Sequence, residues 1–201
     1  MARPPFGGPT PVAAALNLGT LYAFAIIEWA TIRWAGRGAR RPSRRADQGS
    51  AFLIAFTQWG GLALALAAPQ LWPGLNFPGN PWIVVAIGLT LTWAGIALRE
   101  WAIVTLGRFF RRVVMIQEGH RLVTRGPYRF VRHPSYTGAL LALTGFGIAL
   151  DSPVSAAALF VLSLVGYLAR IKVEERALLE AFGEDYRDYA RRTARLVPRV
   201  W

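Results

Sequence analysis

The 201-residue chain has no cysteine and few charged residues. The missing cysteine excludes disulfide bonds, a thiolate metal site and a cysteine nucleophile. Charged residues make up only 17% of the chain, and lysine occurs once against 22 arginines. A soluble domain of this length usually carries about 25% charged residues. The composition therefore argues against an ordinary soluble domain.

Apolar residues are abundant, at 54%, and they come in blocks that suit a membrane. A transmembrane helix needs roughly 20 apolar residues. Five segments are candidates: Val12–Trp34, Ser50–Ala68, Pro81–Leu106, Ser135–Leu150 and Pro153–Ile171. The fourth is short and has a polar start, so we expect it to begin inside protein rather than in lipid. We therefore predict an all-α integral membrane protein with five transmembrane helices.

Positive charge predicts the orientation. The net charge is +12, and the arginines gather after the first, third and fifth segments. Between Pro69 and Asn80 there is no charge at all. By the positive-inside rule, the N-terminus lies outside and the C-terminus is cytoplasmic. The basic loops suit anionic membrane lipids, and we expect no nucleic-acid partner. The first segment is not a convincing signal peptide, because Glu28 interrupts it and a basic leader is missing.

The largest predicted cytoplasmic connector runs from Gly107 to Pro134. Gly126-Pro127 forces a turn, because proline fixes φ and glycine accepts unusual backbone angles. Pro134 suits the first turn of the following helix, which leaves His133 at the helix N-terminus. Exposed amides and the helix dipole favour an anion there, such as the carboxylate of a cofactor. An interfacial loop whose polar side chains only touch lipid headgroups is the alternative.

A second polar group follows the fifth segment. Arg170 and Glu174 are four residues apart and share one helix face, and Glu175 follows directly. An ordinary ion pair on a solvated helix end is the alternative, but two such groups at the same membrane face favour one shared site. The tail from Val173 to Arg192 is predicted to be helical, with a possible break at Gly183. The region between Gly36 and Ser50 has the composition of a linker.

These two groups resemble a known family. The run from Gly119-His120 through Gly126-Pro127-Tyr128 to Arg132-His133-Pro134-Ser135-Tyr136 is similar to the signature of the isoprenylcysteine carboxyl methyltransferases. Phospholipid methyltransferases share a looser version. The ending, with Arg170, Glu174-Glu175, Phe182-Gly183-Glu184-Asp185-Tyr186 and Val197-Pro198, resembles the C-terminal pattern of the same family. The resemblance covers about 40% of the chain, from Glu118 to Pro198.

The resemblance implies a single methyltransferase domain over residues 1–201. Residues 1–106 would form three N-terminal spans, and residues 107–201 would form the catalytic region. It implies S-adenosyl-L-methionine as cofactor, bound under the cytoplasmic connector, and no metal. It also implies that Arg170 and Glu174 face the methyl acceptor. The implied cofactor-binding residues are Gln117, His120, Leu122, Val123, Tyr128, His133, Pro134, Tyr136 and Glu175.

The expected reaction is carboxyl O-methylation of a lipophilic, isoprenylcysteine-like acceptor in the inner membrane of a bacterium or archaeon. A carboxylate acceptor is already ionised at neutral pH and needs no general base. The guanidinium group of Arg170 can bind it through two hydrogen bonds. Glycines on the fourth segment, Gly138, Gly145 and Gly147, suit close approach of either a helix or a ligand. One alternative is N-methylation of phosphatidylethanolamine, with Glu174 as base. Another is a non-catalytic membrane scaffold or small transporter. A reductase lacks support, because no glycine-rich dinucleotide motif is present.

Overall fold

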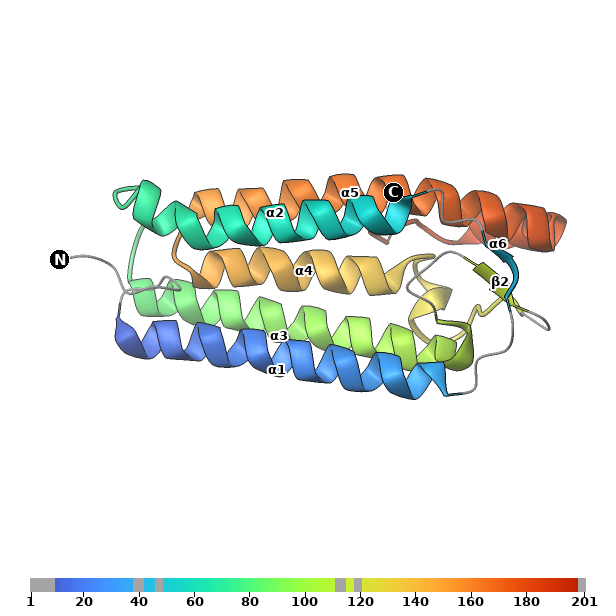
Figure 1. Cartoon of the computed structure of the whole chain (residues 1–201), viewed down its shortest axis with the longest axis horizontal. Helices are drawn as coiled ribbons and strands as arrows, with labels where there is room; N and C mark the ends of the chain where they lie inside the picture. The colour runs from blue at the N-terminus through green and yellow to red at the C-terminus, as the bar shows by residue number, and fades with distance from the viewer. Residues whose placement is uncertain (1–9, 38–41, 46–48, 111–114, 118–120, 199–201) are drawn as a thin grey trace.

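The computed structural model of the protein describes residues 10–37, 42–45, 49–110, 115–117 and 121–198. Within these residues the chain forms a bundle of long helices (Figure 1). The helices are α1 (Pro11–Gly36), α2 (Ser50–Leu71), α3 (Pro81–Leu106), α4 (Pro134–Ala149), α5 (Pro153–Phe182) and α6 (Glu184–Arg192). Two 3-10 turns, η1 (Gly107–Phe109) and η2 (Gly126–Arg129), and two strands, β1 (Pro42–Arg45) and β2 (Met115–Gln117), complete the fold.

Three of the long helices begin at a capping side chain that is followed by proline. The side chain of Thr10 accepts a hydrogen bond from the backbone of Ala13, and Ser152 caps α5 in the same way. Asn80 caps α3 through the amide of Trp82. Such a cap satisfies an amide that the helix leaves unpaired, and proline fits the first helical turn. These local signals set where the helices start.

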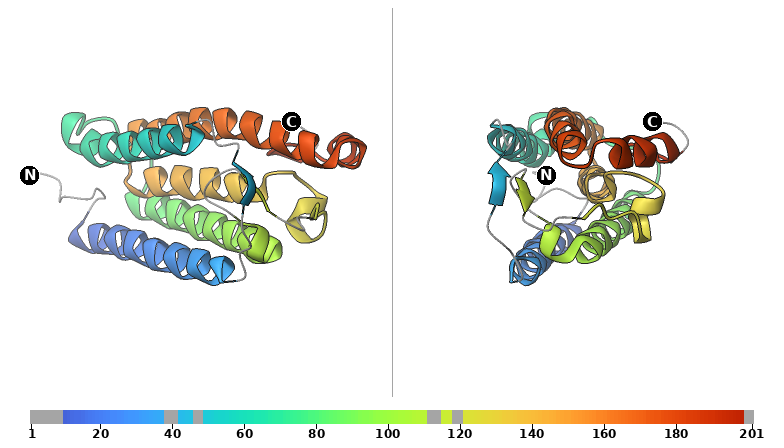
Figure 2. Two further views of the ribbon diagram at one scale, coloured as in Figure 1. Left: turned by 45° about the vertical axis from the view of Figure 1, so that its right-hand side comes forward. Right: turned by 90° about the vertical axis from the view of Figure 1, so that its right-hand side faces the viewer.

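Four of the described helices are long and apolar enough to cross a membrane: α1, α2, α3 with η1, and α5. The prediction of five spans is thus confirmed for four helices. The fifth, α4, has 16 residues and is about 24 Å long at 1.5 Å per residue, against about 30 Å of hydrocarbon. It lies between the α2–α5 pair and the α1–α3 pair (Figures 1 and 2). Ten of its residues are buried, so α4 forms the centre of the bundle.

Two predicted boundaries are corrected by the structure. Helix α5 does not end near Ile171 but continues to Phe182, so the fifth span and the first half of the predicted tail helix are one helix. The predicted break at Gly183 is confirmed, since this glycine has φ +53° and separates α5 from α6. An L-residue rarely adopts this backbone angle, which explains the glycine. The continuous helix carries Arg170, Glu174 and Glu175 on one rigid element.

The prediction of a purely helical protein misses a small sheet. Strands β1 and β2 pair antiparallel, with Pro42 opposite Gln117 and Arg45 opposite Met115. One strand comes from the predicted linker and the other from the connector, and they lie near the end of the bundle that carries α6 (Figure 1). We call this end the α6 end. Strands this short leave no alternating pattern in the sequence.

Glycines allow α3 and α4 to pack almost backbone to backbone. A Cβ atom on Gly145 would lie 2.6 Å from the amide nitrogen of Thr92 and 2.8 Å from the carbonyl oxygen of Gly88. A Cβ atom on Gly138 would lie 2.6 Å from the amide nitrogen of Arg99. Gly147 faces α5 instead, close to Ala156. Of the two interpretations of these glycines, helix packing is therefore the one that the structure confirms.

We expect Gly145→Ala to destabilise the protein by about 1–3 kcal/mol, because the methyl group has no space against the α3 backbone. Thermal unfolding in detergent should show a clearly lower midpoint. Gly60→Ala is the matched control, since nothing lies within 4 Å of a Cβ atom at Gly60 on α2. Equal midpoints for the two variants would contradict the close packing of α3 and α4.

Candidate active site

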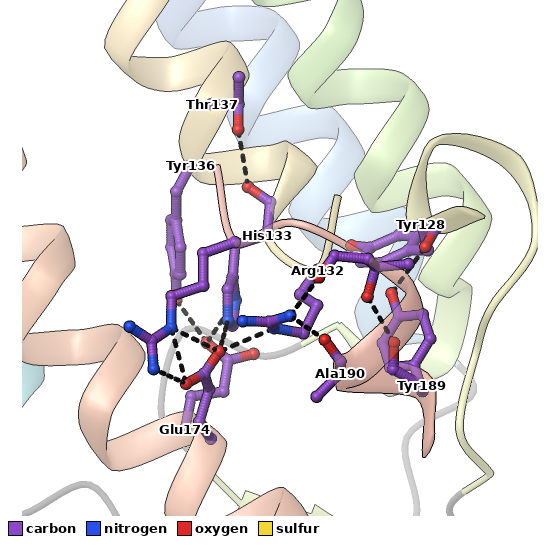
Figure 3. A network of polar contacts seen from close by, with 11 residues as sticks. Tyr128, Arg132, His133, Tyr136, Thr137, Glu174, Tyr189 and Ala190 are labelled. Carbon is purple, nitrogen blue, oxygen red and sulfur yellow. Dashed lines mark hydrogen bonds and ion pairs between the residues drawn. The ribbon is translucent and has the colours of Figure 1, made fainter. Parts of the chain in front are cut away.

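The two sequence motifs meet at the α6 end of the bundle. The hydroxyl of Tyr136, in the first turn of α4, donates a hydrogen bond of 2.9 Å to Oε2 of Glu174 on α5. The ring nitrogen Nε2 of His133 lies 3.4 Å from Oε1 of Glu175 (Figure 3). The sequence separation across these contacts is 38 and 42 residues. The predicted approach of the two motifs is thus confirmed.

Glu175 contacts Arg132, His133 and Arg195. Its carboxylate accepts a hydrogen bond of 2.9 Å from Nε of Arg132 and lies 3.1 Å from Nη2 of Arg195. Its side chain is only 17% exposed. Charge-assisted bonds of this kind are the strong ones, and they hold the carboxylate in place. We expected a cofactor carboxylate beside His133, but in the structure the protein's own Glu175 lies there.

The segment after α6 fastens this arrangement. The backbone amide of Arg132 donates to the carbonyl of Ala194 at 2.8 Å, and that of His133 donates to Arg195 at 3.1 Å. The Arg132 guanidinium also donates to Ala190 at 2.8 Å and to the carbonyl of Thr193 (Figure 3). Arg132 therefore connects the start of α4 to α5, through Glu175, and to the end of α6, through Ala190 and Thr193.

Arg132 and Arg195 are missing from the residues predicted for the site. Arg132 stands inside the recognised signature, directly before His133, so its position was a usable signal. No local pattern distinguishes Arg195 from the other arginines of the tail.

Tyr128, one of the predicted cofactor residues, is buried in η2. Its backbone carbonyl accepts a hydrogen bond of 2.7 Å from the hydroxyl of Tyr189 on α6. Burial raises the pKa of Tyr189 to about 12 and that of Tyr128 well above the usual value. Both phenols therefore stay protonated at neutral pH and remain hydrogen-bond donors.

Arg170 is buried beside the start of α2. It is 3% exposed, and its Nη1 donates a hydrogen bond of 2.9 Å to the hydroxyl of Ser50 at the start of α2. The Tyr136 hydroxyl, which donates to Glu174, interacts with Arg170 as well. Arg170 and Glu174 thus share Tyr136 as a neighbour. That both face the methyl acceptor stays a prediction. Ser50 was not predicted for the site.

The remaining predicted residues differ in what the structure says of them. Pro134 is buried and starts α4. Leu122 and Val123 are half-buried in the coil before η2. Gln117 is the last residue of β2, where only the backbone is described, and His120 lies outside the described residues.

The contacts described above form one polar group, which consists of Arg132, His133, Tyr136, Arg170, Glu174, Glu175 and Arg195. A cavity of about 590 Å³ lies next to this polar group, among α1, α2, α3, α4 and α5. Most of its wall is apolar and is formed by residues such as Leu21, Phe24, Leu62, Ile96, Leu143 and Phe146. Its polar residues include Glu28 and Arg99, whose Oε2 and Nε atoms are 2.7 Å apart, and Tyr167. The Tyr167 ring stacks on Tyr136 with 4.9 Å between centroids. A mostly apolar cavity thus adjoins the polar group through the stacked rings of Tyr167 and Tyr136.

The residues at the α6 end have the chemistry to hold S-adenosyl-L-methionine, which carries a sulfonium, an ammonium group, a carboxylate and an adenine ring. Glu174 is 32% exposed, and its carboxylate can accept more bonds than the one from Tyr136. Arginine and histidine side chains supply donors for a carboxylate, and the tyrosines supply flat apolar surfaces. The donor set therefore fits the cofactor.

Comparison with known proteins agrees with the sequence resemblance. Residues 86–180 match the isoprenylcysteine carboxyl methyltransferase (ICMT) family. The chain is 41% identical over 128 residues to protein-S-isoprenylcysteine O-methyltransferase B of Arabidopsis thaliana, covering 62% of this chain and 65% of that protein. It is 37% identical over 114 residues to the enzyme of Tribolium castaneum, covering 56% and 41%. The resemblance stated from the signature is confirmed.

The fold also has a solved relative. A structure of the eukaryotic intramembrane Ras methyltransferase ICMT, solved without a monobody, superposes with a TM-score of 0.61 at 30% sequence identity. The alignment covers 73% of this chain and 52% of that one. The chain thus spans about two fifths to two thirds of the length of these relatives.

Proposed function

The chain is related through residues 86–180 to the isoprenylcysteine carboxyl methyltransferase family, and on this premise we propose that it is a membrane methyltransferase. It uses S-adenosyl-L-methionine to methylate the carboxylate of a lipophilic, isoprenylcysteine-like acceptor. One observation carries this proposal. The buried Arg170 and the pair Tyr136–Glu174 belong to the polar group at the α6 end, and Tyr136 stacks on Tyr167, which lines an apolar cavity.

The polar group is the proposed cofactor site. Glu174 would take the positively charged part of the cofactor, and Tyr128, His133 and Tyr136 would bound the pocket. Glu175 would lie beside the methionine part, oriented by Arg132. When bound, S-adenosyl-L-methionine supplies an electrophilic methyl group. The residues Gln117, His120, Leu122, Val123 and Pro134 complete the proposed set.

The chain's own residues would bind and desolvate the acceptor. A carboxylate acceptor is ionised at neutral pH, so the site needs no general base. Arg170 offers a planar fork of donors that suits a carboxylate, and its burial removes competing water. Glu174, through the Tyr136 hydroxyl, would keep Arg170 from turning away. Holding the acceptor in this position supplies the orientation that methyl transfer requires.

The apolar cavity is the proposed place for the acceptor's lipophilic chain. Along α1, its lining extends from Thr20 to Arg33, which is about 20 Å at 1.5 Å per residue. An extended chain advances about 3.5 Å for every three bonds, so a farnesyl group of twelve consecutive bonds spans about 14 Å. The cavity is therefore long enough for a farnesyl chain, which could enter sideways from the bilayer.

The protein is a multi-pass membrane protein, and we propose that the α6 end faces the cytoplasm. The arginines that follow α1, α3 and α5 support this orientation under the positive-inside rule. It places the N-terminus outside and the cofactor site where S-adenosyl-L-methionine is available. In a bacterium or archaeon the membrane would be the inner membrane. In this arrangement α4 would be a fifth, buried span.

The decisive experiment is calorimetric titration of the purified protein with S-adenosyl-L-methionine, followed by a labelled-methyl assay. We expect saturable cofactor binding and methylation of a farnesylcysteine analogue. The acceptor panel should include the methyl ester of that analogue, which has no free carboxylate, and phosphatidylethanolamine. Labelling of the ester or of phosphatidylethanolamine alone would contradict carboxyl methylation. Failure to bind the cofactor at all would support a scaffold without catalytic activity.

A further inference from the structure

Tyr167 lies at the junction between the cavity and the polar group. Its ring lines the cavity and stacks on Tyr136, with an interplanar angle of 19°. Tyr136 in turn stacks on His133, with 5.7 Å between ring centroids and the same angle. Three nearly parallel rings thus lead from the polar group to the cavity wall. A ligand that extends along these rings from the polar group into the cavity passes beside Tyr167.

Gln58 on α2 holds the hydroxyl group of Tyr167. Its side-chain amide donates a hydrogen bond to the Tyr167 hydroxyl oxygen, and Gln58 also lines the cavity. Tyr167 is 3% exposed, and a buried hydroxyl requires a partner. A glutamine amide has two donor hydrogens and one acceptor oxygen, so the bond to Tyr167 uses only part of its capacity. The amide can therefore also form a hydrogen bond with a polar atom of a ligand in the cavity.

Close packing of α2 and α5 fixes both side chains. Gly166 precedes Tyr167, and a Cβ atom there would meet Thr57, the residue that precedes Gln58. One turn further, a Cβ atom on Gly61 would lie 3.6 Å from the side chain of Leu162. Helices α2 and α5 therefore pack against each other directly beside the bond between Gln58 and Tyr167.

We propose that Gln58 and Tyr167 form a positioning pair for the methyl acceptor. The pair would bind the polar segment between the lipophilic chain and the carboxylate, so that the carboxylate reaches Arg170 and Glu174. This inference rests on the proposed function and extends it. It assigns part of acceptor recognition to α2, which lies outside the residues that match the family.

Two conservative substitutions and their combination test the pair. Tyr167→Phe keeps the stacked ring and removes the hydroxyl, and Gln58→Leu removes the amide at similar volume. Each should lower kcat for a farnesylcysteine analogue about tenfold at saturating acceptor, the usual loss for one positioned hydrogen bond. The double variant should also lose about tenfold, because both changes remove the same unit. The Kd for S-adenosyl-L-methionine should stay within about twofold, which also shows that the variants fold.

Two substitutions of the same kinds at exposed positions serve as matched controls. Tyr22→Phe on α1 changes an exposed tyrosine, and Gln70→Leu changes an exposed glutamine on α2. Neither residue lines the cavity, and both variants should keep the wild-type kcat. An unchanged kcat in Tyr167→Phe, a roughly hundredfold additive loss in the double variant, or an equal loss in the controls would each overturn the positioning pair. The proposed function survives these results if the wild-type protein methylates the analogue, and both fall if it does not.

Discussion

Arg170→Ala should reduce turnover of the acceptor by about a thousandfold while leaving the affinity for S-adenosyl-L-methionine within a few fold. Loss of a preorganised donor in a site shielded from water typically costs a factor of about 100–1,000. Arg170 is placed for this role by its burial, by its bond to Ser50 and by the Tyr136 hydroxyl beside it. The measurement is a labelled-methyl assay at saturating cofactor, with cofactor affinity from calorimetry.

Two further variants separate chemistry from folding. Arg176→Ala, on the exposed side of the same helix, should keep nearly full activity. Arg170→Lys keeps the charge but lacks the planar fork, so it should recover only a small part of the activity. Full turnover in Arg170→Ala, in protein that still binds the cofactor, would exclude Arg170 from acceptor binding.

Glu175→Gln should weaken cofactor binding about a hundredfold and lower the stability of the protein. The substitution removes the negative charge that Arg132, His133 and Arg195 share, so these groups lose their common partner. Breaking a largely buried ion pair costs about 3 kcal/mol or more, because the remaining charge stays buried. Calorimetric titration measures the affinity, and thermal unfolding in detergent measures the stability.

Glu184→Gln is the matched control for this change. Glu184 forms an exposed ion pair with Arg187 on α6, with side chains 71% and 55% exposed. An exposed pair of this kind contributes at most about 1 kcal/mol, so both cofactor affinity and unfolding midpoint should stay close to wild type. If Glu175→Gln behaved like Glu184→Gln, the carboxylate would have no organising role.

The sequence predicted that the two motifs meet and where some of the helices begin and end, but it missed other details of the bundle. Local sequence rules were enough to place His133 at the start of α4, because Pro134 follows it and proline is favoured at the first position of a helix. They also sufficed for Gly183, where the left-handed backbone requires glycine. The approach of Tyr136 to Glu174 followed from the family signature rather than from spacing.

What the sequence could not supply are contacts between distant segments. Arg195 resembles every other tail arginine until the chain folds back and aligns Ala194 with Val131. Gln58 and Ser50 look like ordinary polar residues of a span, and only helix packing brings them to Tyr167 and Arg170. The short β1–β2 pairing depends on backbone geometry that leaves no periodic signal.

The glycine contacts between α3 and α4 also decide how the protein can open. Backbones that touch at Gly145 and Gly138 cannot slide past one another without collision, so the two helices must move as one rigid body. Any motion that widens access from the bilayer to the cavity would then move α1 or the α2–α5 pair around this fixed centre. Spin labels on α3 and α4 should keep one separation throughout turnover, whereas labels on α1 and α5 should report two.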